Sequence, residues 1–171
     1  DNKNLQFTPS EKKLIEEAGF ILTNAHVVEG VSSARIKMSD GRLFIGSVIG
    51  RDELIDLALL KVSGSELPVV ELGNSDENAL RQGDEVFTLG YPFGLEGDVK
   101  FKEGTISGRQ TYEDATYLET SAEIHPGNSG GPLVNRFGQV VGVNVGAYGK
   151  SIGGISVGET IKWAIPINIA K

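Results

Sequence analysis

The sequence contains no cysteine. This absence excludes a disulfide framework, a thiol nucleophile and any zinc or iron–sulfur site built on cysteine ligands. It does not identify a compartment, because a cysteine-free protein is compatible with oxidising and with reducing surroundings. Cysteine usage therefore limits the chemistry of this chain and leaves its location open.

Positive charge is also scarce, with 16 Lys and Arg against 23 Asp and Glu and a formal net charge of −7. An acidic chain without a basic run has no electrostatic reason to bind nucleic acid or an anionic membrane. No stretch approaches 18 consecutive apolar residues, so no transmembrane helix is predicted. Residues 1–7 are polar and mixed in character and do not resemble a signal peptide.

Turn-forming residues are abundant, since 23 of the 171 residues are glycine and 6 are proline. Such frequent turn-forming residues favour many short strands over long helices. Apolar or alternating runs predict strands at 20–22, 34–38, 43–49, 57–62, 69–72, 85–89, 104–107, 117–120, 132–135, 139–145 and 163–167. Gly46 is expected at a bend in its strand. The pattern is typical of an all-β sandwich or of barrels.

The polar stretch at residues 73–78 is the best candidate for a connection between two halves. We therefore expect a divergent or truncated N-terminal segment at 1–18, a first barrel at 19–75 and a second barrel at 83–171. The two barrels together would form one domain.

The segment HPGNSGGPL at residues 125–133 carries the clearest chemical signal. A serine between glycines can be presented on a tight turn with its hydroxyl exposed. The backbone N–H groups of Gly127 and Ser129 could then point into one space and stabilise an oxyanion. The alternative is a glycine-rich hairpin without chemistry.

Chain order distinguishes among the known serine hydrolases. The Gly-x-Ser-x-Gly pattern also occurs in α/β-hydrolases, but their histidine follows the serine. Here both histidines, His26 and His125, precede Ser129. The subtilisin order requires an aspartate before the histidine, and only Asp1 precedes His26. The remaining order is His, Asp, Ser, as in chymotrypsin-like enzymes.

His26 and Asp56 complete this order. His26 follows a predicted strand, and Asp56 stands directly before an apolar strand. A carboxylate buried there needs a partner such as an imidazole N–H. His125 is the other candidate for the general base, but it shares a turn with Ser129. We therefore interpret it as part of the loop wall or of a substrate subsite. The nearby alternatives to Asp56 are Asp52 and Glu53, which lie in a polar turn and are expected to face solvent.

These segments resemble the protease domain of the HtrA/Deg family over residues 19–171. The matching motifs are LTNAHVV at 22–28, DLALLKV at 56–62, GYPFG at 90–94, GTIS at 104–107, PGNSGGPL at 126–133 and AIP at 164–166. The resemblance implies two packed six-stranded antiparallel barrels of the trypsin/chymotrypsin type, with the catalytic cleft between them. It implies His26 and Asp56 on the first barrel and Ser129 on the second. It also implies an oxyanion hole from the N–H groups of Gly127, Asn128 and Ser129.

The resemblance further implies degradation of unfolded or misfolded proteins outside the cytoplasm, in protein quality control, and assembly as a homotrimer. Family members often carry a PDZ domain after the protease domain, and this chain ends at Lys171 before any such domain. The Gly-Ser-Gly entry into the second strand that is usual in the family is missing, and the family's first strand is not recognisable before it. The trimers of the family use this region. Residues 147–162 match the activation and specificity loop only in position.

Three residues are candidates for the substrate pocket: Glu123, Ile124 and Val145. Glu123 stands where chymotrypsin-like enzymes place the floor of the S1 pocket, so it could select Lys or Arg in the substrate. The favoured alternative is that period-two alternation turns Glu123 outward and leaves Ile124 to line an aliphatic pocket. Val145 replaces the threonine that the family often has beside the cleft.

The sequence therefore predicts a serine endopeptidase that works through an acyl-enzyme, with Ser129 as nucleophile, His26 as base and then acid, and Asp56 as orienting carboxylate. This chemistry requires no metal and no cofactor. The rival hypothesis is a catalytically silent relative that binds peptides or unfolded chains. A third hypothesis is an enzyme held in a resting state until a ligand orders its loops.

Overall fold

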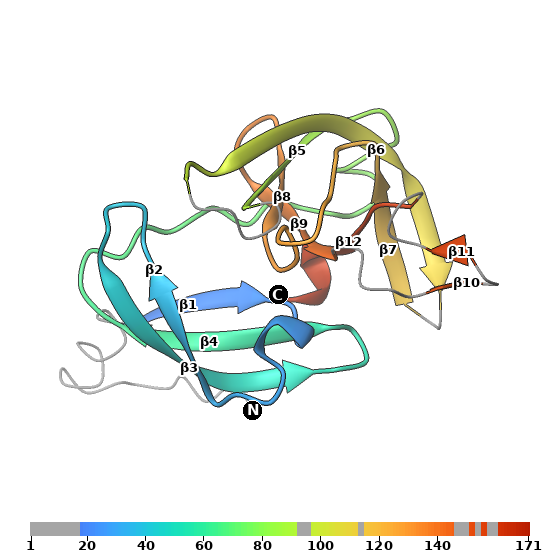
Figure 1. Ribbon diagram of the computed structural model, residues 1–171. Helices are drawn as coiled ribbons and strands as arrows, with labels where there is room; N and C mark the ends of the chain where they lie inside the picture. The colour runs from blue at the N-terminus through green and yellow to red at the C-terminus, as the bar shows by residue number, and fades with distance from the viewer. Residues whose placement is uncertain (1–17, 92–96, 113–114, 146–150, 153–154, 157–160) are drawn as a thin grey trace, which may run out of the picture.

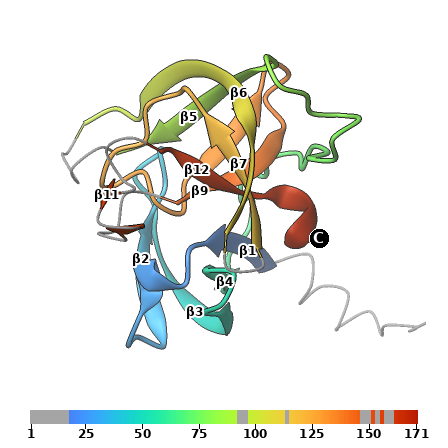
Figure 2. The ribbon, with the colours of Figure 1, turned by 90° about the vertical axis from the view of Figure 1, so that its right-hand side faces the viewer.

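The fold comes from a computed structural model, which describes residues 18–91, 97–112, 115–145, 151–152, 155–156 and 161–171. Two halves are stacked on one another, a four-stranded sheet and a closed barrel (Figures 1 and 2). The expectations for residues 1–17, for 92–94 of the GYPFG motif and for most of 147–162 lie outside the described residues. No helix among the described residues has the length and apolar character that crossing a membrane requires.

The first half is an antiparallel sheet in the order β1-β4-β3-β2. Its strands are β1 (Ala18–Thr23), β2 (Ser33–Lys37), β3 (Leu43–Asp52) and β4 (Leu57–Ser63). The short 3₁₀ helix η1 (His26–Val28) follows β1. A small apolar cluster of Val28, Ala58 and Leu60 anchors this helix to the sheet, because all three side chains are buried.

Gly46 does not mark the bend that the sequence suggested. It lies in regular register between Ala34 and Val62, and the irregularity of β3 falls between Val48 and Gly50. A Cβ at Gly46 would come 2.5 Å from Ile36 Cδ1. The Ile36 side chain thus lies over the backbone of this glycine and would have to move to accommodate a larger residue.

The second half is a closed antiparallel barrel in the order β12-β7-β6-β5-β8-β9. Its strands are β5 (Glu85–Gly90), β6 (Lys100–Tyr112), β7 (Ala115–Thr120), β8 (Pro132–Asn135), β9 (Val140–Val145) and β12 (Trp163–Pro166). Inward side chains fill it with one apolar cluster: Leu80, Val86, Ile106, Leu118, Leu133, Val141 and Ala164. Closure leaves none of these six strands as a free edge. A two-stranded ribbon of β10 (Ser151–Ile152) and β11 (Ile155–Ser156) lies beside it.

The two halves meet through the outer face of the barrel. Leu57, the first residue of β4, belongs to one buried cluster with Val143, Ile165 and Ile167. Trp163 extends this cluster and stacks on Tyr117 with 4.9 Å between ring centroids. Because Leu57 follows Asp56 directly, the packing between the halves also fixes the position of a candidate catalytic residue.

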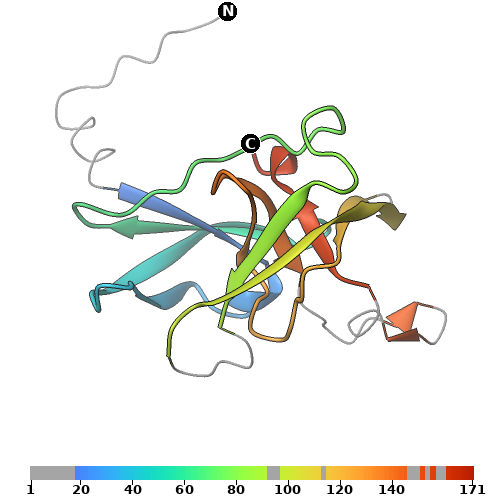
Figure 3. The ribbon, with the colours of Figure 1, turned by 90° about the horizontal axis from the view of Figure 1, so that it is seen from above.

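The connection between the halves runs along the outside of the molecule, beside the C-terminus (Figure 3). The C-terminal 3₁₀ helix η3 (Ile167–Ile169) holds it, because Asn168 N–H donates to Ser75 Oγ and Asn168 Nδ2 donates to Asn74 and Asp76. The predicted strand at 69–72 was wrong. Only Leu72 makes a bridge, to Val140. Val69 is 93% exposed, so no burial of its side chain favours a strand at this position.

The all-β class predicted from the sequence is confirmed. The described residues supply four strands to the first half and six to the barrel. Asp56 and Ser129 come from turns at the boundary between the two halves, and His26 comes from η1 at the same boundary.

Candidate active site

His26 is positioned by the end of β1 and the start of η1. The chain leaves β1 at Thr23, and His26 opens the 3₁₀ helix whose buried residue is Val28. That anchor keeps the imidazole at the boundary between the halves, where its side chain is 20% exposed. A half-buried imidazole can still exchange protons with a substrate.

Asp56 is presented by the turn between β3 and β4. Asp52 shapes this turn, since its Oδ1 accepts hydrogen bonds from the backbone N–H groups of Leu54 and Ile55. Asp56 itself has a φ of 56°, in the left-handed region that non-glycine residues rarely adopt. This backbone conformation precedes the buried Leu57 and turns the carboxylate toward His26.

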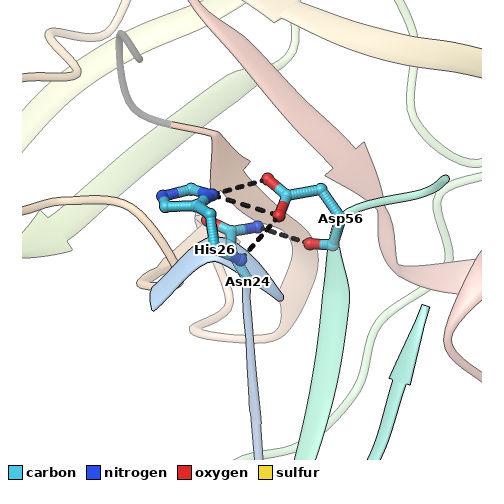
Figure 4. A network of polar contacts seen from close by, with 3 residues as sticks. All are labelled: Asn24, His26 and Asp56. Carbon is cyan, nitrogen blue, oxygen red and sulfur yellow. Dashed lines mark hydrogen bonds and ion pairs between the residues drawn. The ribbon is translucent and has the colours of Figure 1, made fainter. Parts of the chain in front are cut away.

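Three contacts join Asp56 to His26 (Figure 4). Asp56 Oδ2 lies 2.8 Å and Oδ1 lies 3.1 Å from His26 Nδ1. Asp56 Oδ1 also accepts the backbone N–H of His26 at 3.0 Å. A carboxylate on Nδ1 favours the tautomer with its proton there, so Nε2 is left as an acceptor.

Ser129 lies in a turn that backbone hydrogen bonds hold. Asn128 N–H donates to His125 O at 2.9 Å, and Gly131 N–H donates to Asn128 O at 3.0 Å. Gly127 and Gly130 have φ values of 96° and 77°, which explains why these two positions of the turn are glycine. Among the described residues, no hydrogen bond occupies the N–H groups of Gly127 and Ser129.

The Ser129 turn touches the strand that leads to His26. A Cβ on Gly130 would overlap Thr23 Oγ1 and would lie 3.1 Å from Asn24 N. Only a glycine permits this approach, in which the backbone after Ser129 sits against the end of β1. The turn is fixed to the barrel by Gly130 N–H, which donates to Asn144 O at 2.9 Å.

Glu123 does not have a free carboxylate. Its Oε2 lies 2.8 Å from Lys102 Nζ and 3.4 Å from His125 Nε2, and its side chain is half exposed. The hydrogen bond from Lys102, followed by that from His125, lowers the pKa of the Glu123 carboxyl below its ordinary value. The charge that would select a basic substrate side chain is thus already paired with a cation of this chain.

The other two pocket candidates lie in the barrel half. Ile124 is buried at 3% exposure, and Val145 is partly buried at the end of β9. Their role in substrate selection stays a prediction. Of the alternatives weighed from the sequence, Asp52 and Glu53 are both exposed, and the ring of His125 lies beside Glu123.

Sequence reasoning missed two residues that support the site. Asn24 Nδ2 donates to Asp56 O at 3.0 Å, and Thr88 Oγ1 donates to Glu123 O at 2.8 Å. Both side chains are fully buried. The sequence offered one signal for them. Asn24 follows an apolar strand and Thr88 lies within one, and a polar side chain buried at such a place requires a hydrogen-bond partner.

Comparisons with known proteins show which family this fold belongs to. The family model described as "Trypsin-like peptidase domain" matches residues 14–143. A protein named "Probable periplasmic serine endoprotease DegP-like", from Marinomonas sp. (strain MWYL1), is 37% identical over 159 residues, covering 92% of this chain and 33% of that protein. A protein of the same name from Hahella chejuensis (strain KCTC 2396) is 40% identical over 159 residues, with the same two coverages.

Among solved structures, "HtrA-type protease AlgW with decapeptide" superposes with a TM-score of 0.76 at 36% identity, covering 91% of this chain and 46% of that chain. This similarity confirms the trypsin-type fold. The chain spans 33% of the length of the two DegP-like relatives. By its family match, its relatives and its fold, the chain belongs to the trypsin-like peptidase family, with HtrA/DegP-type serine proteases as its relatives.

Proposed function

We propose that this protein is a serine endopeptidase with His26, Asp56 and Ser129 as its catalytic triad. The observation that carries the proposal is the contact of Gly130 with Thr23 and Asn24, because it brings the turn of Ser129 to the strand end that leads to His26. The contact between His26 Nδ1 and Asp56 supports the same roles.

In the proposed reaction, Ser129 Oγ attacks the carbonyl carbon of the scissile peptide bond while its proton passes to His26 Nε2. His26 then donates that proton to the leaving amine, and an acyl-enzyme on Ser129 remains. A water molecule gives its proton to His26 Nε2 and hydrolyses the ester, after which Ser129 regains its proton. Asp56 keeps its charge throughout and stabilises the imidazolium.

The tetrahedral intermediates carry a negative oxygen that needs hydrogen-bond donors. We expect the N–H groups of Gly127 and Ser129 to provide them, because no partner occupies them among the described residues. Asn128, the third donor expected from the resemblance, already gives its N–H to His125 O at 2.9 Å. Its part in the oxyanion hole is therefore the maintenance of the turn.

The S1 pocket is proposed to take an aliphatic side chain. Ile124 and Val145 are apolar, and the Glu123 carboxylate is held by Lys102 at 2.8 Å. Burying a substrate lysine against Glu123 would require breaking that ion pair. An uncharged P1 residue is therefore the expected preference.

The physiological substrates are proposed to be unfolded or misfolded proteins outside the cytoplasm. The location is supported by the names of the relatives, which include periplasmic DegP-like endoproteases. The substrate class comes from the resemblance to the HtrA/Deg family. The possible homotrimer stays a prediction of the family resemblance, and light scattering after gel filtration would test it.

The deciding experiment is hydrolysis of unfolded casein by the protein and by Ser129→Ala, with a fluorophosphonate probe as a second readout. The proposal is supported if the unsubstituted protein cleaves casein and is labelled by the probe, while Ser129→Ala does neither. Labelling without cleavage would indicate a reactive serine in a resting enzyme. Absence of both, also with unfolded protein added, would favour the catalytically silent, peptide-binding alternative.

A further inference from the structure

The side chain of Asn24 is fully buried directly behind the candidate triad. Strand β1 pairs with β4 up to Thr23 and Ala58, and Asn24 directly follows the end of β1. From there its Nδ2 donates to the backbone carbonyl of Asp56 at 3.0 Å (Figure 4). The partner is a carbonyl oxygen, so only a donor can meet it.

Asp56 requires such support because of its backbone. Among the described non-glycine residues, only Asp56 and Glu66 have a positive φ, with values of 56° and 52°. A left-handed backbone at a residue with a Cβ is unfavourable unless its surroundings hold it. Glu66 has a comparable device, since Arg42 Nη2 donates to its carbonyl at 3.0 Å.

The carbonyl and the carboxylate of Asp56 are held from two sides. Asn24 holds the carbonyl, and His26 holds the carboxylate through Nδ1 and through its backbone N–H. If the carbonyl were released, the peptide could rotate toward a more common φ. The direction of the Cα–Cβ bond would then change, and with it the distance from the carboxylate to Nδ1.

We infer that Asn24 is a positioning residue of the triad, whose side-chain amide keeps Asp56 in the left-handed conformation that aims its carboxylate at His26. The inference rests on the proposed function for its catalytic consequence. Its structural part, the orientation of Asp56, does not depend on activity. Asn24 does not touch the reacting atoms, so its effect is expected in kcat and not in KM.

The first variant is Asn24→Leu, which keeps the branched shape and the number of side-chain heavy atoms and removes the donor. We expect kcat to fall about tenfold to a hundredfold with little change in KM, as for the loss of a buried hydrogen bond that the transition state needs. In proton NMR, the low-field resonance of the His26 Nδ1–H bound to a carboxylate should weaken or shift. A purely structural role would lower the denaturation midpoint without moving that resonance.

The second variant, Asn24→Asp, tests the donor itself. An ionised aspartate would face the Asp56 carbonyl with no proton, whereas a protonated one can donate. The ratio of variant to wild-type kcat should therefore rise as the pH is lowered, while the ratio for Asn24→Leu stays flat. Equal pH dependence of the two ratios would speak against the donor role.

Asn135→Ala is the matched control. Asn135 Oδ1 accepts the backbone N–H groups of Phe137 and Gln139 in the β8–β9 turn, so its loss removes side-chain support of a backbone elsewhere. This variant should lose stability and keep both the resonance and kcat.

The inference is overturned if Asn24→Leu retains the wild-type kcat and the wild-type resonance. If the wild type shows no hydrolysis that depends on Ser129, the proposed function fails instead. In that case the resonance alone decides whether Asn24 holds Asp56 against His26.

Discussion

The backbone of Gly130, which follows Ser129, lies so close to Thr23 at the end of β1 that a Cβ on this residue would overlap Thr23 Oγ1. This contact crosses the boundary between the barrel and the four-stranded sheet. It fixes the Ser129 turn relative to the strand that leads to His26. The packing of the two halves at this contact therefore sets the position of Ser129 relative to His26.

Substitution Gly130→Ala should therefore remove activity. The new Cβ would overlap Thr23 Oγ1, and the φ of 77° adds strain of about 1–2 kcal/mol. Gly138→Ala is the matched control, since Gly138 has a φ of 78° and nothing within 4 Å of its Cβ position. Casein hydrolysis and urea denaturation of both variants check this. Equal activity losses in the two would mean that the contact with Thr23 has no special role.

Substitution Asp56→Asn should lower kcat by about 10³- to 10⁴-fold with the fold retained. The amide cannot stabilise the imidazolium, and it favours the wrong tautomer of His26. The expected control is Asp52→Asn, because Asp52 is exposed and its Oδ1 acceptor would remain. Steady-state kinetics on a peptide substrate measure both. Near-normal kcat in Asp56→Asn would remove Asp56 from the triad.

Peptide-library profiling should show enrichment of aliphatic P1 residues and none of Lys or Arg. The physical reason is the ion pair between Glu123 and Lys102, at 2.8 Å, which already neutralises the carboxylate. Glu123→Gln should leave the profile unchanged. A basic P1 preference that disappears in Glu123→Gln would instead support the cation-selecting hypothesis.

The same ion pair gives a pH-dependent contribution to stability. Lys102, and then His125, lowers the pKa of Glu123 in the folded chain below the ordinary value of 4.5. The stabilisation is therefore fully present above pH 4.5 and is lost as the pH falls through the lowered pKa. The difference in urea midpoint between wild type and Glu123→Gln should be small at neutral pH and should vanish in acid. A difference that grows in acid would contradict the sign of this shift.

Trp163→Ala should destabilise the protein by about 3–5 kcal/mol, because the indole is buried in the cluster between the halves and stacks on Tyr117. Phe137→Ala, at a side chain that is 71% exposed, should change stability by less than about 0.5 kcal/mol. Calorimetry or urea denaturation measures both. The only tryptophan of the chain also gives wild-type unfolding a fluorescence signal, which should shift to longer wavelength as Trp163 meets water.

Much of the fold could be predicted from the sequence because its signals are local. Alternation of apolar and polar residues in 34–38 predicted β2 (Ser33–Lys37), and the apolar run at 57–62 predicted β4 (Leu57–Ser63). The order of His26, Asp56 and Ser129 selected one arrangement of a serine protease site. The contact of His26 with Asp56 is consistent with that order, while the catalytic roles stay predictions.

Tertiary structure alone decided the features that depend on partners distant in the chain. The pairing of Glu123 with Lys102, the support of Asp56 by Asn24 and the lack of a strand at 69–72 all fall in this class. Composition and periodicity show which side chains are apolar or charged. They do not show which backbone carbonyl or carboxylate lies within 3 Å, because strand register and the packing of the two halves set those distances.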